Sequence, residues 1–398
     1  MGVFLFFYYY IQERKRGGNM VHTATLTYMF NNTEYGLYEA FKEVPGTIYM
    51  QQHIKWFNDS LQGQGINIWC YKLSGFEMYV FVLRINFIRM IEQQNRINVM
   101  TFNDINDIEK KFNELIKQIT PGMPEFNQWK VNRIDYCCNI YTPYVKEYIK
   151  LLQKSDVPPN LKKIANHNGN YAFRPGSYYA VSKARDRRTG KTGSITVNFY
   201  DKHQELIYQR DIKNDQRITD EIIDQGINIL RLEVQCHKPK TDYLKVKYAM
   251  TTKNIHYFLR PEICYDVISR VIKQICGTGS YFKKKNAERI IDTLNCRNTK
   301  KNKLKCMLHD IARSSIYNIK NLYNDDGIMK ISTFKSYLKL LESVDVNAVV
   351  LPRDIKAENG RIDSVMTLFN EAYRNETFID DSLDLFDIET FVDEELEL

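Results

Sequence analysis

The chain has 398 residues and a net charge of +8, which is long enough for a large core and two or three domains. Ten of its 48 acidic residues lie between Glu376 and Glu397, where there is no Lys or Arg, so the rest of the chain is markedly basic. A basic body indicates a polyanionic partner, most often nucleic acid. The alternative interpretation is a solvated basic surface that binds nothing.

Cysteine and motif content exclude several classes of protein. None of the eight cysteines forms a Cys-x-x-Cys pair, which argues against a zinc ribbon. A chain of this length does not need disulfides, so we expect reduced thiols and a cytoplasmic location. No Gly-x-x-x-x-Gly-Lys-[Ser/Thr] loop is present, which argues against nucleotide hydrolysis by that route. The apolar run at residues 3–11 is too short to span a bilayer, so no membrane partner is expected.

Both ends of the chain differ in character from its body. Charges follow the apolar run at residues 3–11 instead of preceding it, the reverse of a secretory signal. We therefore expect Met20 to be the true start and residues 1–19 to be a non-native upstream extension. Residues 351–398 are expected to form an acidic, flexible tail.

The body of the chain predicts an α+β fold with a largely antiparallel sheet and flanking helices, followed by a smaller helical C-terminal region. Alternation of apolar and polar residues predicts strands, and apolar residues at helical spacing predict helices. The expected strands are 21–31, 66–72, 76–86, 131–141, 177–184, 194–200 and 227–235, and the clearest helices are 103–119 and 144–154. We expect residues 20–240 to form the α+β domain and residues 241–350 to form the helical region.

A helix at residues 332–346 follows a glycine-containing turn, and Phe334, Tyr337, Leu338 and Leu341 share one face of it. A short helix after such a turn is typical of a helix-turn-helix, which would make residues 241–350 a DNA-binding region. Many ordinary helical hairpins have the same pattern, and that interpretation stays open.

Residues 194–210 contain the candidate nucleophile. Ile195, Val197 and Phe199 alternate with polar residues, so Tyr200 lies on the less apolar face, at the end of the predicted strand. A phenol of pKa near 10 is mostly protonated at neutral pH and needs a nearby metal or cation to act as a nucleophile. Lys202 lies two residues beyond Tyr200.

Two other predicted strands carry an acidic residue in an apolar setting, Asp135 and Glu233. A carboxylate inside a strand is unfavourable unless it has a partner. Arg133 and Arg231 each stand two positions earlier, hence on the same face of the strand as the acid. On these residues alone, structural ion pairs are the simpler interpretation.

A basic turn joins the strands 177–184 and 194–200, which we expect to pair as a hairpin. Its cations are Arg185, Arg187, Arg188 and Lys191. Because this hairpin ends at Tyr200, the turn is a candidate for gripping DNA phosphates. The alternative is a solvated loop.

Three stretches in order resemble the rolling-circle replication initiators of small Gram-positive plasmids and the phage gene II/X-type replication proteins. They are Arg133-Ile-Asp135, then Phe199-Tyr-Asp-Lys-His-Gln-Glu205, then Leu230-Arg-Leu-Glu233. The resemblance covers roughly residues 70–240. Asn86 and Asn139 stand where the family carries acids, which leaves fewer carboxylates for a metal. No His-hydrophobic-His pair is present, which agrees with carboxylate-based relatives.

The resemblance implies a sequence-specific, metal-dependent DNA nickase that starts rolling-circle replication. Tyr200 would attack the origin phosphate, form a 5′-phosphotyrosyl bond and release a 3′-hydroxyl primer. Asp135 and Glu233, with Glu205 as a further ligand, would hold Mg²⁺ or Mn²⁺. Lys202 and Arg231 would face the phosphate, and Arg133 would contact DNA. The implied partners are origin DNA, a host helicase and polymerase, and a second copy of the chain as a homodimer.

Two alternatives stay open. A non-catalytic DNA-binding replication or regulatory protein would keep the basic surface without the chemistry, consistent with Asn86 and Asn139. A carboxylate-metal nuclease would use water in place of Tyr200 as the nucleophile.

Overall fold

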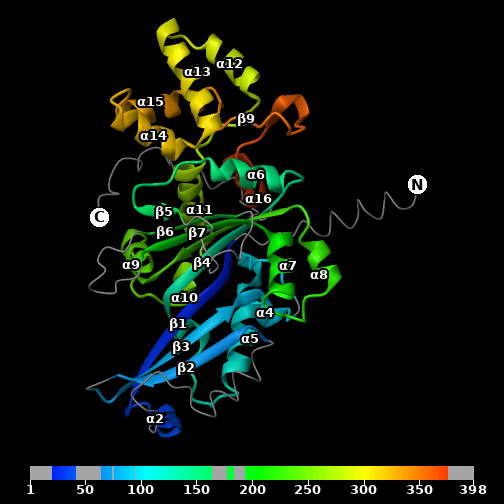
Figure 1. The fold of residues 1–398 in the computed structure, drawn as a ribbon. Coiled ribbons are helices and arrows are strands. Elements are labelled where there is room, and N and C mark those ends of the chain that lie inside the picture. The colour runs from blue at the N-terminus through cyan, green and yellow to red at the C-terminus, as the bar shows by residue number, and fades with distance from the viewer. Residues whose placement is uncertain are drawn as a thin grey trace.

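The computed structural model describes residues 20–41, 64–73, 76–93, 95–163, 177–182 and 193–374. Within these residues, the centre of the molecule is an eight-stranded antiparallel sheet of order β2-β3-β1-β4-β8-β7-β6-β5 (Figure 1). The predicted α+β class with a largely antiparallel sheet is confirmed. The strands are β1 (Val21–Asn31), β2 (Ile66–Lys72), β3 (Met78–Asn86), β4 (Lys130–Tyr141), β5 (Leu161–Lys163), β6 (Ser177–Ser182), β7 (Ile195–Asp201) and β8 (Ile229–Cys236).

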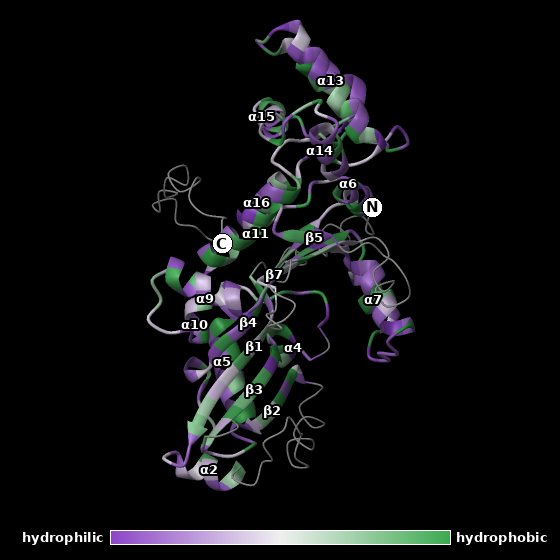
Figure 2. Ribbon diagram, turned by 60° about the vertical axis from the view of Figure 1, so that its left-hand side comes forward, coloured by the Kyte–Doolittle hydropathy of each residue, from purple (hydrophilic) through white to green (hydrophobic). Residues whose placement is uncertain are grey.

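Helices lie on both sides of this sheet. Figure 2 shows α9 (Lys238–Lys247) and α10 (Ile255–Phe258) on one side and α7 (Lys202–Asp211) on the other. The other elements are α2 (Tyr35–Phe41), α4 (Phe87–Ile91), α5 (Ile105–Ile116), α6 (Val145–Gln153), α8 (Asp220–Gln225), α11 (Pro261–Ile275), α12 (Lys284–Thr293), α13 (Asn298–Arg313), α14 (Ile316–Asp325), α15 (Ile331–Glu342), α16 (Val365–Arg374) and the short strands β9 (Tyr281–Phe282) and β10 (Arg361–Ile362).

Alternation in the central strands separates an apolar face from a polar face. On β8, Leu230, Leu232 and Val234 point into the main core, which α11 and α16 complete. The intervening residues of β8 face α7, where Leu206 and Ile229 belong to a second, smaller apolar cluster. The sheet is therefore covered on both faces at its centre, and the polar residues of its second face are enclosed.

The helical region does not begin as a separate body at residue 241. Helices α9, α10 and α11 pack directly on β4, and α9 and α11 also pack on β8. One continuous core extends from Met20 to Tyr373. The change from strands to helices lies near residue 240 as predicted, but it does not coincide with a change of core. Helices α12 to α15 form the end of the molecule farthest from α2 (Figure 1).

The predicted tail also begins too early. Helix α16 packs on β4 and α11, and it buries Val365, Phe369 and Tyr373. These residues follow helical spacing, so burial of an apolar face outweighs the acidic composition around them. Residues 351–374 thus belong to the fold, whereas 375–398, like the proposed extension 1–19, lie outside the described residues.

Helix α15 coincides with most of the helix predicted at 332–346. Phe334 and Leu341 are fully buried, and Tyr337 and Leu338 are partly buried against the same core. The apolar stripe therefore packs the helical end of the molecule together.

In the part of the chain that the structure describes, every helix is too short or too polar to cross a membrane.

Candidate active site

The strands β4, β8 and β7, which carry the predicted site residues, are neighbours in the sheet. Residues directly opposite one another form rows, such as Asn139, Arg231 and Tyr200. Opposed side chains on one face lie close enough to interact. The polar face of these strands is made by Asp135, Cys137 and Asn139 from β4, by Arg231, Glu233 and Gln235 from β8, and by Thr196, Asn198 and Tyr200 from β7.

Tyr200 lies on this polar face with its hydroxyl beside a carboxylate. The hydroxyl donates to Glu233 Oε2 at 3.4 Å, and the residue is only 5% exposed. Burial raises the pKa of Tyr200 well above its usual value, the charge of Glu233 raises it further, and Arg231 opposes both. The phenol is therefore protonated at neutral pH, and a nucleophilic role requires Glu233 or another acceptor to take its proton.

Glu233 is the carboxylate best placed to accept that proton. Its Oε1 accepts a hydrogen bond from Gln235 Nε2 at 2.7 Å, and its Oε2 lies 3.9 Å from His22 Nδ1. Burial lowers the pKa of His22 well below its usual value, and the positive charges of Arg231 and Lys202 lower it further. His22 is therefore neutral at pH 7, and these contacts leave the charge of Glu233 without a directly bonded cation.

Arg231 is fully buried and is held by groups other than Glu233. Its Nε donates to Asn139 Oδ1 at 2.7 Å, and its Nη2 donates to the carbonyl of Ile97. Asn139 Nδ2 also donates to the Ile97 carbonyl, at 2.9 Å. Asn139 thus orients the guanidinium, and the alternative ion pair between Arg231 and Glu233 is not the arrangement found.

Lys202 and Glu205 stand at the start of α7, next to Tyr200 in sequence. Asp201 caps this helix by accepting from Gln204 N at 3.2 Å, which fixes where β7 ends and α7 begins. Lys202 Nζ lies 2.7 Å from Glu205 Oε2, and burial lowers the pKa of Lys202. Burial also raises the pKa of Glu205, but the charge and hydrogen bond of Lys202 outweigh it and lower the pKa overall.

Asp135 forms the ion pair with Arg133 that the simpler interpretation expects. Arg133 Nε and Nη2 donate to Asp135 Oδ1 and Oδ2 at 2.7 and 2.8 Å, and Thr23 Oγ1 also donates to Oδ2. Burial raises the pKa of Asp135 to about 6, against the hydrogen bonds from Arg133 and with help from the charge of Glu233. Arg133 is therefore engaged within the sheet.

Sequence patterns did not identify His22 as part of this site. Strict alternation along β1 puts residue 22 on the apolar face with Ala24 and Leu26. A β-bulge intervenes, because Val21 pairs with Tyr136 and Thr23 with Asp135, the residue just before it. The extra residue turns His22 to the polar face, where Nε2 lies 3.3 Å from Asn86 Nδ2. No feature of the sequence marks this bulge.

The three predicted metal ligands do not fit a shared cation as they are placed. Both oxygens of Asp135 are engaged by Arg133, and those of Glu205 by Lys202 and Gln209. Among the described residues, no three His, Cys, Asp or Glu side chains are grouped so as to hold a metal ion. Each of these two acids is neutralised by its own cation, whereas Glu233 accepts hydrogen bonds from the neutral groups of Gln235 and Tyr200.

The basic turn with Arg185, Arg187, Arg188 and Lys191 lies outside the described residues. Its two flanking strands do pair antiparallel as predicted. Tyr200 pairs with Ser177, at the opposite end of the hairpin from Ser182 and Ile195, which the turn joins. The strand pairing of the hairpin therefore gives no reason to expect the basic turn near Tyr200.

Comparisons with models of known families, with curated proteins and with solved structures find no match to this chain.

Proposed function

We propose that the protein is a DNA nickase and strand transferase in which Tyr200 is the nucleophile, and that it initiates rolling-circle replication. The observation that carries the proposal is the Tyr200 hydroxyl 3.4 Å from Glu233 Oε2. A phenol beside a carboxylate, near buried cations, is what transesterification of a phosphodiester requires. The resemblance of the three motif stretches supplies DNA as the substrate.

The proposed step is balanced without a further reactant. The Tyr200 oxygen attacks phosphorus, the P–O bond to the 3′ side breaks, and a 5′-phosphotyrosyl ester forms. Glu233 accepts the phenol proton, and the departing 3′ oxygen takes up a proton to become a hydroxyl. Arg231 and Lys202 are the buried cations that would offset charge on the phosphate oxygens, Arg231 with an Nη1 that has no hydrogen-bond partner among the described residues.

The proposed function also implies a substrate, partner proteins and a cellular location. Origin DNA would be the substrate, a host helicase and polymerase would extend the 3′-hydroxyl, and the reaction would take place in the cytoplasm. A homodimer belongs to the same proposal. Mg²⁺ or Mn²⁺ dependence also stays part of it through the resemblance, although the carboxylates as placed give no shared ligand set.

The test is incubation with supercoiled DNA that carries the genetic element encoding the chain, followed by detection of protein joined to a 5′ end. The wild type should nick and become covalently attached, with Mg²⁺ or Mn²⁺ present, and Tyr200→Phe should do neither. Tyr136→Phe is the matched control, because it removes a hydroxyl from the apolar face of β4, two strands away, where the hydroxyl donates to the carbonyl of Phe258 at 3.0 Å.

Other outcomes would identify the alternatives. Cleavage that survives in Tyr200→Phe would indicate a nuclease that uses water. Binding of DNA without any cleavage by the wild type would indicate a non-catalytic DNA-binding protein. The same assay is repeated with a chelator. Cleavage that continues uses side chains alone, whereas cleavage that stops needs a divalent cation.

A further inference from the structure

A cleft of about 360 Å³ opens beside the candidate active site. One wall is the face of α7 formed by Lys202, Glu205, Leu206 and Gln209, which follow helical spacing. Other parts of the lining come from the end of β3 and from α4. His22 also lines it, so the cleft is continuous with the polar face that carries Tyr200 and Glu233.

The lining of this cleft is strongly basic. Among the described residues, the charged side chains of the lining are those of Arg84, Arg89, Arg96, Lys202 and Arg217 against those of Glu205 and Asp215. Burial, together with the charges of Arg96 and Arg217, lowers the pKa of Arg89 to about 10. The concentration of positive charge in this lining makes a bound anion favourable.

Several of these cations are held in place by the fold without being neutralised. Arg96 Nη1 donates to two backbone carbonyls, those of Gln93 at 2.8 Å and Asn95 at 3.3 Å. The Nε of Arg89 is buried with no hydrogen-bond partner in the described part of the chain. Arg84 is exposed on β3 and forms no ion pair with any described residue. These guanidinium groups are thus oriented and available to a ligand.

Lys202, which pairs with Glu205, and Arg217 are the exceptions. Arg217 pairs with Asp215. Its Nε and Nη2 donate to Asp215 Oδ1 and Oδ2 at 2.6 and 3.0 Å, while its side chain stays half exposed. The pair fixes the loop that closes one side of the cleft.

The uncharged lining indicates what kind of anion fits. It includes the amides of Asn67, Asn86, Asn95 and Asn98, and a glycine, Gly65, whose φ of +76° suits a tight turn. No Phe, Tyr or Trp lines the cleft among the described residues. Single-strand sites that hold bases use aromatic stacking, whereas guanidinium and amide groups contact phosphate and sugar.

We propose that this cleft binds the sugar-phosphate backbone of a single DNA strand next to the phosphodiester that is cut, without reading its sequence. The proposal rests on the proposed function for the identity of the strand. The volume is near the lower end of that of small-molecule pockets, which suits a short run of one strand. His22, which lines the cleft, lies 3.9 Å from Glu233 Oε2, so the bound strand would adjoin the Tyr200–Glu233 pair.

The test measures binding apart from cleavage. Fluorescence anisotropy with labelled single-stranded oligonucleotides of mixed and homopolymer sequence, over a range of salt, uses the full chain. Arg84→Gln with Arg217→Gln should lower affinity about tenfold per guanidinium removed, equally for every sequence. The slope of log affinity against log salt should fall by about 0.7 for each phosphate that the variant no longer neutralises.

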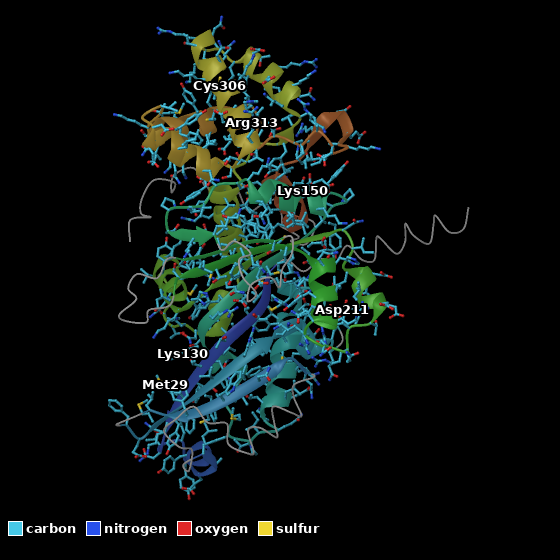
Figure 3. All side chains as sticks on the ribbon, in the orientation of Figure 1. Met29, Lys130, Lys150, Asp211, Cys306 and Arg313 are labelled. Carbon is cyan, nitrogen blue, oxygen red and sulfur yellow. The ribbon has the colours of Figure 1, made fainter. Side chains whose placement is uncertain are left out.

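A matched control removes two positive charges elsewhere. Lys130 and Lys150, which are labelled in Figure 3, are exposed and line no part of the cleft. Lys130→Gln with Lys150→Gln should keep both the affinity and most of the salt slope. Arg84→Glu alone should also weaken binding. Because Arg84 is exposed, this single variant tests the cleft even if the double variant misfolds.

The possible outcomes distinguish DNA binding by the cleft from DNA nicking by Tyr200. The cleft proposal would be overturned if the cleft variants bind DNA as well as the wild type does, or if they lose affinity for one base sequence only. Nicking by the wild type would in that case still support the proposed function. Cleft-dependent binding by a wild type that never nicks would support the cleft and remove the proposed function. Tyr200→Phe should bind as the wild type does.

Discussion

The two faces of β8 are both buried but are stabilised in different ways. On one face, Leu230, Leu232 and Val234 are fully enclosed by apolar neighbours. On the other, Arg231 is equally inaccessible and Glu233 is 6% exposed. Burial of hydrocarbon stabilises a fold directly, whereas buried charges must first recover the free energy of losing water.

The polar face of β8 therefore carries side chains that selection for stability alone would not retain. Apolar residues of similar volume often replace a buried charge network with no loss of stability. The polar face also leaves one nitrogen of Arg231 and both side-chain polar atoms of Asn198 without hydrogen-bond partners among the described residues. Such groups, gathered beside a tyrosine and a basic cleft, indicate a face arranged for a ligand.

The largest expected effect on stability comes from Arg231→Met. The change removes the guanidinium that donates to Asn139 Oδ1 in a closed environment, so the free energy of unfolding should fall by about 3–5 kcal/mol. Leu232→Ala, on the other face, should cost about 2–5 kcal/mol by leaving a cavity. Chemical denaturation measures both.

The two faces should then respond differently to a second change. Adding Asn139→Leu to Arg231→Met should recover part of the loss, because both hydrogen-bonding partners are then apolar. A loss below about 1 kcal/mol for Arg231→Met would show that the polar face is not a buried network.

A smaller effect of opposite sign is expected for Asn198→Leu. Asn198 is fully buried opposite Glu233, and neither of its side-chain polar atoms has a partner among the described residues. Removing an unpaired amide should raise the free energy of unfolding by about 1–2 kcal/mol. Nicking should fall at the same time if the amide serves the substrate. Thermal denaturation and the nicking assay together decide, and a loss of stability would contradict the prediction.

The smallest effect on stability separates the two tyrosines. Tyr136→Phe leaves the Phe258 carbonyl without this donor inside the core and should cost about 1 kcal/mol with no effect on nicking. Tyr200→Phe removes a longer hydrogen bond, so its cost should be below about 1 kcal/mol while covalent capture of DNA is lost. If Tyr136→Phe and Tyr200→Phe nick DNA equally well, the Tyr200 hydroxyl has no catalytic role.

Much of the fold follows from local patterns in the sequence. Alternation in residues 195–201 places Tyr200 opposite the apolar face, as it is found, because the two-residue period of a strand depends on the strand alone. The same argument finds β4 and β8 and predicts that Arg133 and Asp135 share a face. The predicted start of the tail at residue 351 is wrong, because it depends on which helices complete the core, and α16 is one of them.

The α+β class, the strands that carry Tyr200, Asp135 and Glu233, and the face on which each lies can all be predicted from local patterns. The bulge that turns His22 to Glu233, the pairing of Arg231 with Asn139, 92 positions away, and the cleft lined by α4 and α7 are visible only in the folded chain. Side-chain alternation is set within one strand, whereas register, bulges and clefts depend on contacts between segments far apart in the chain.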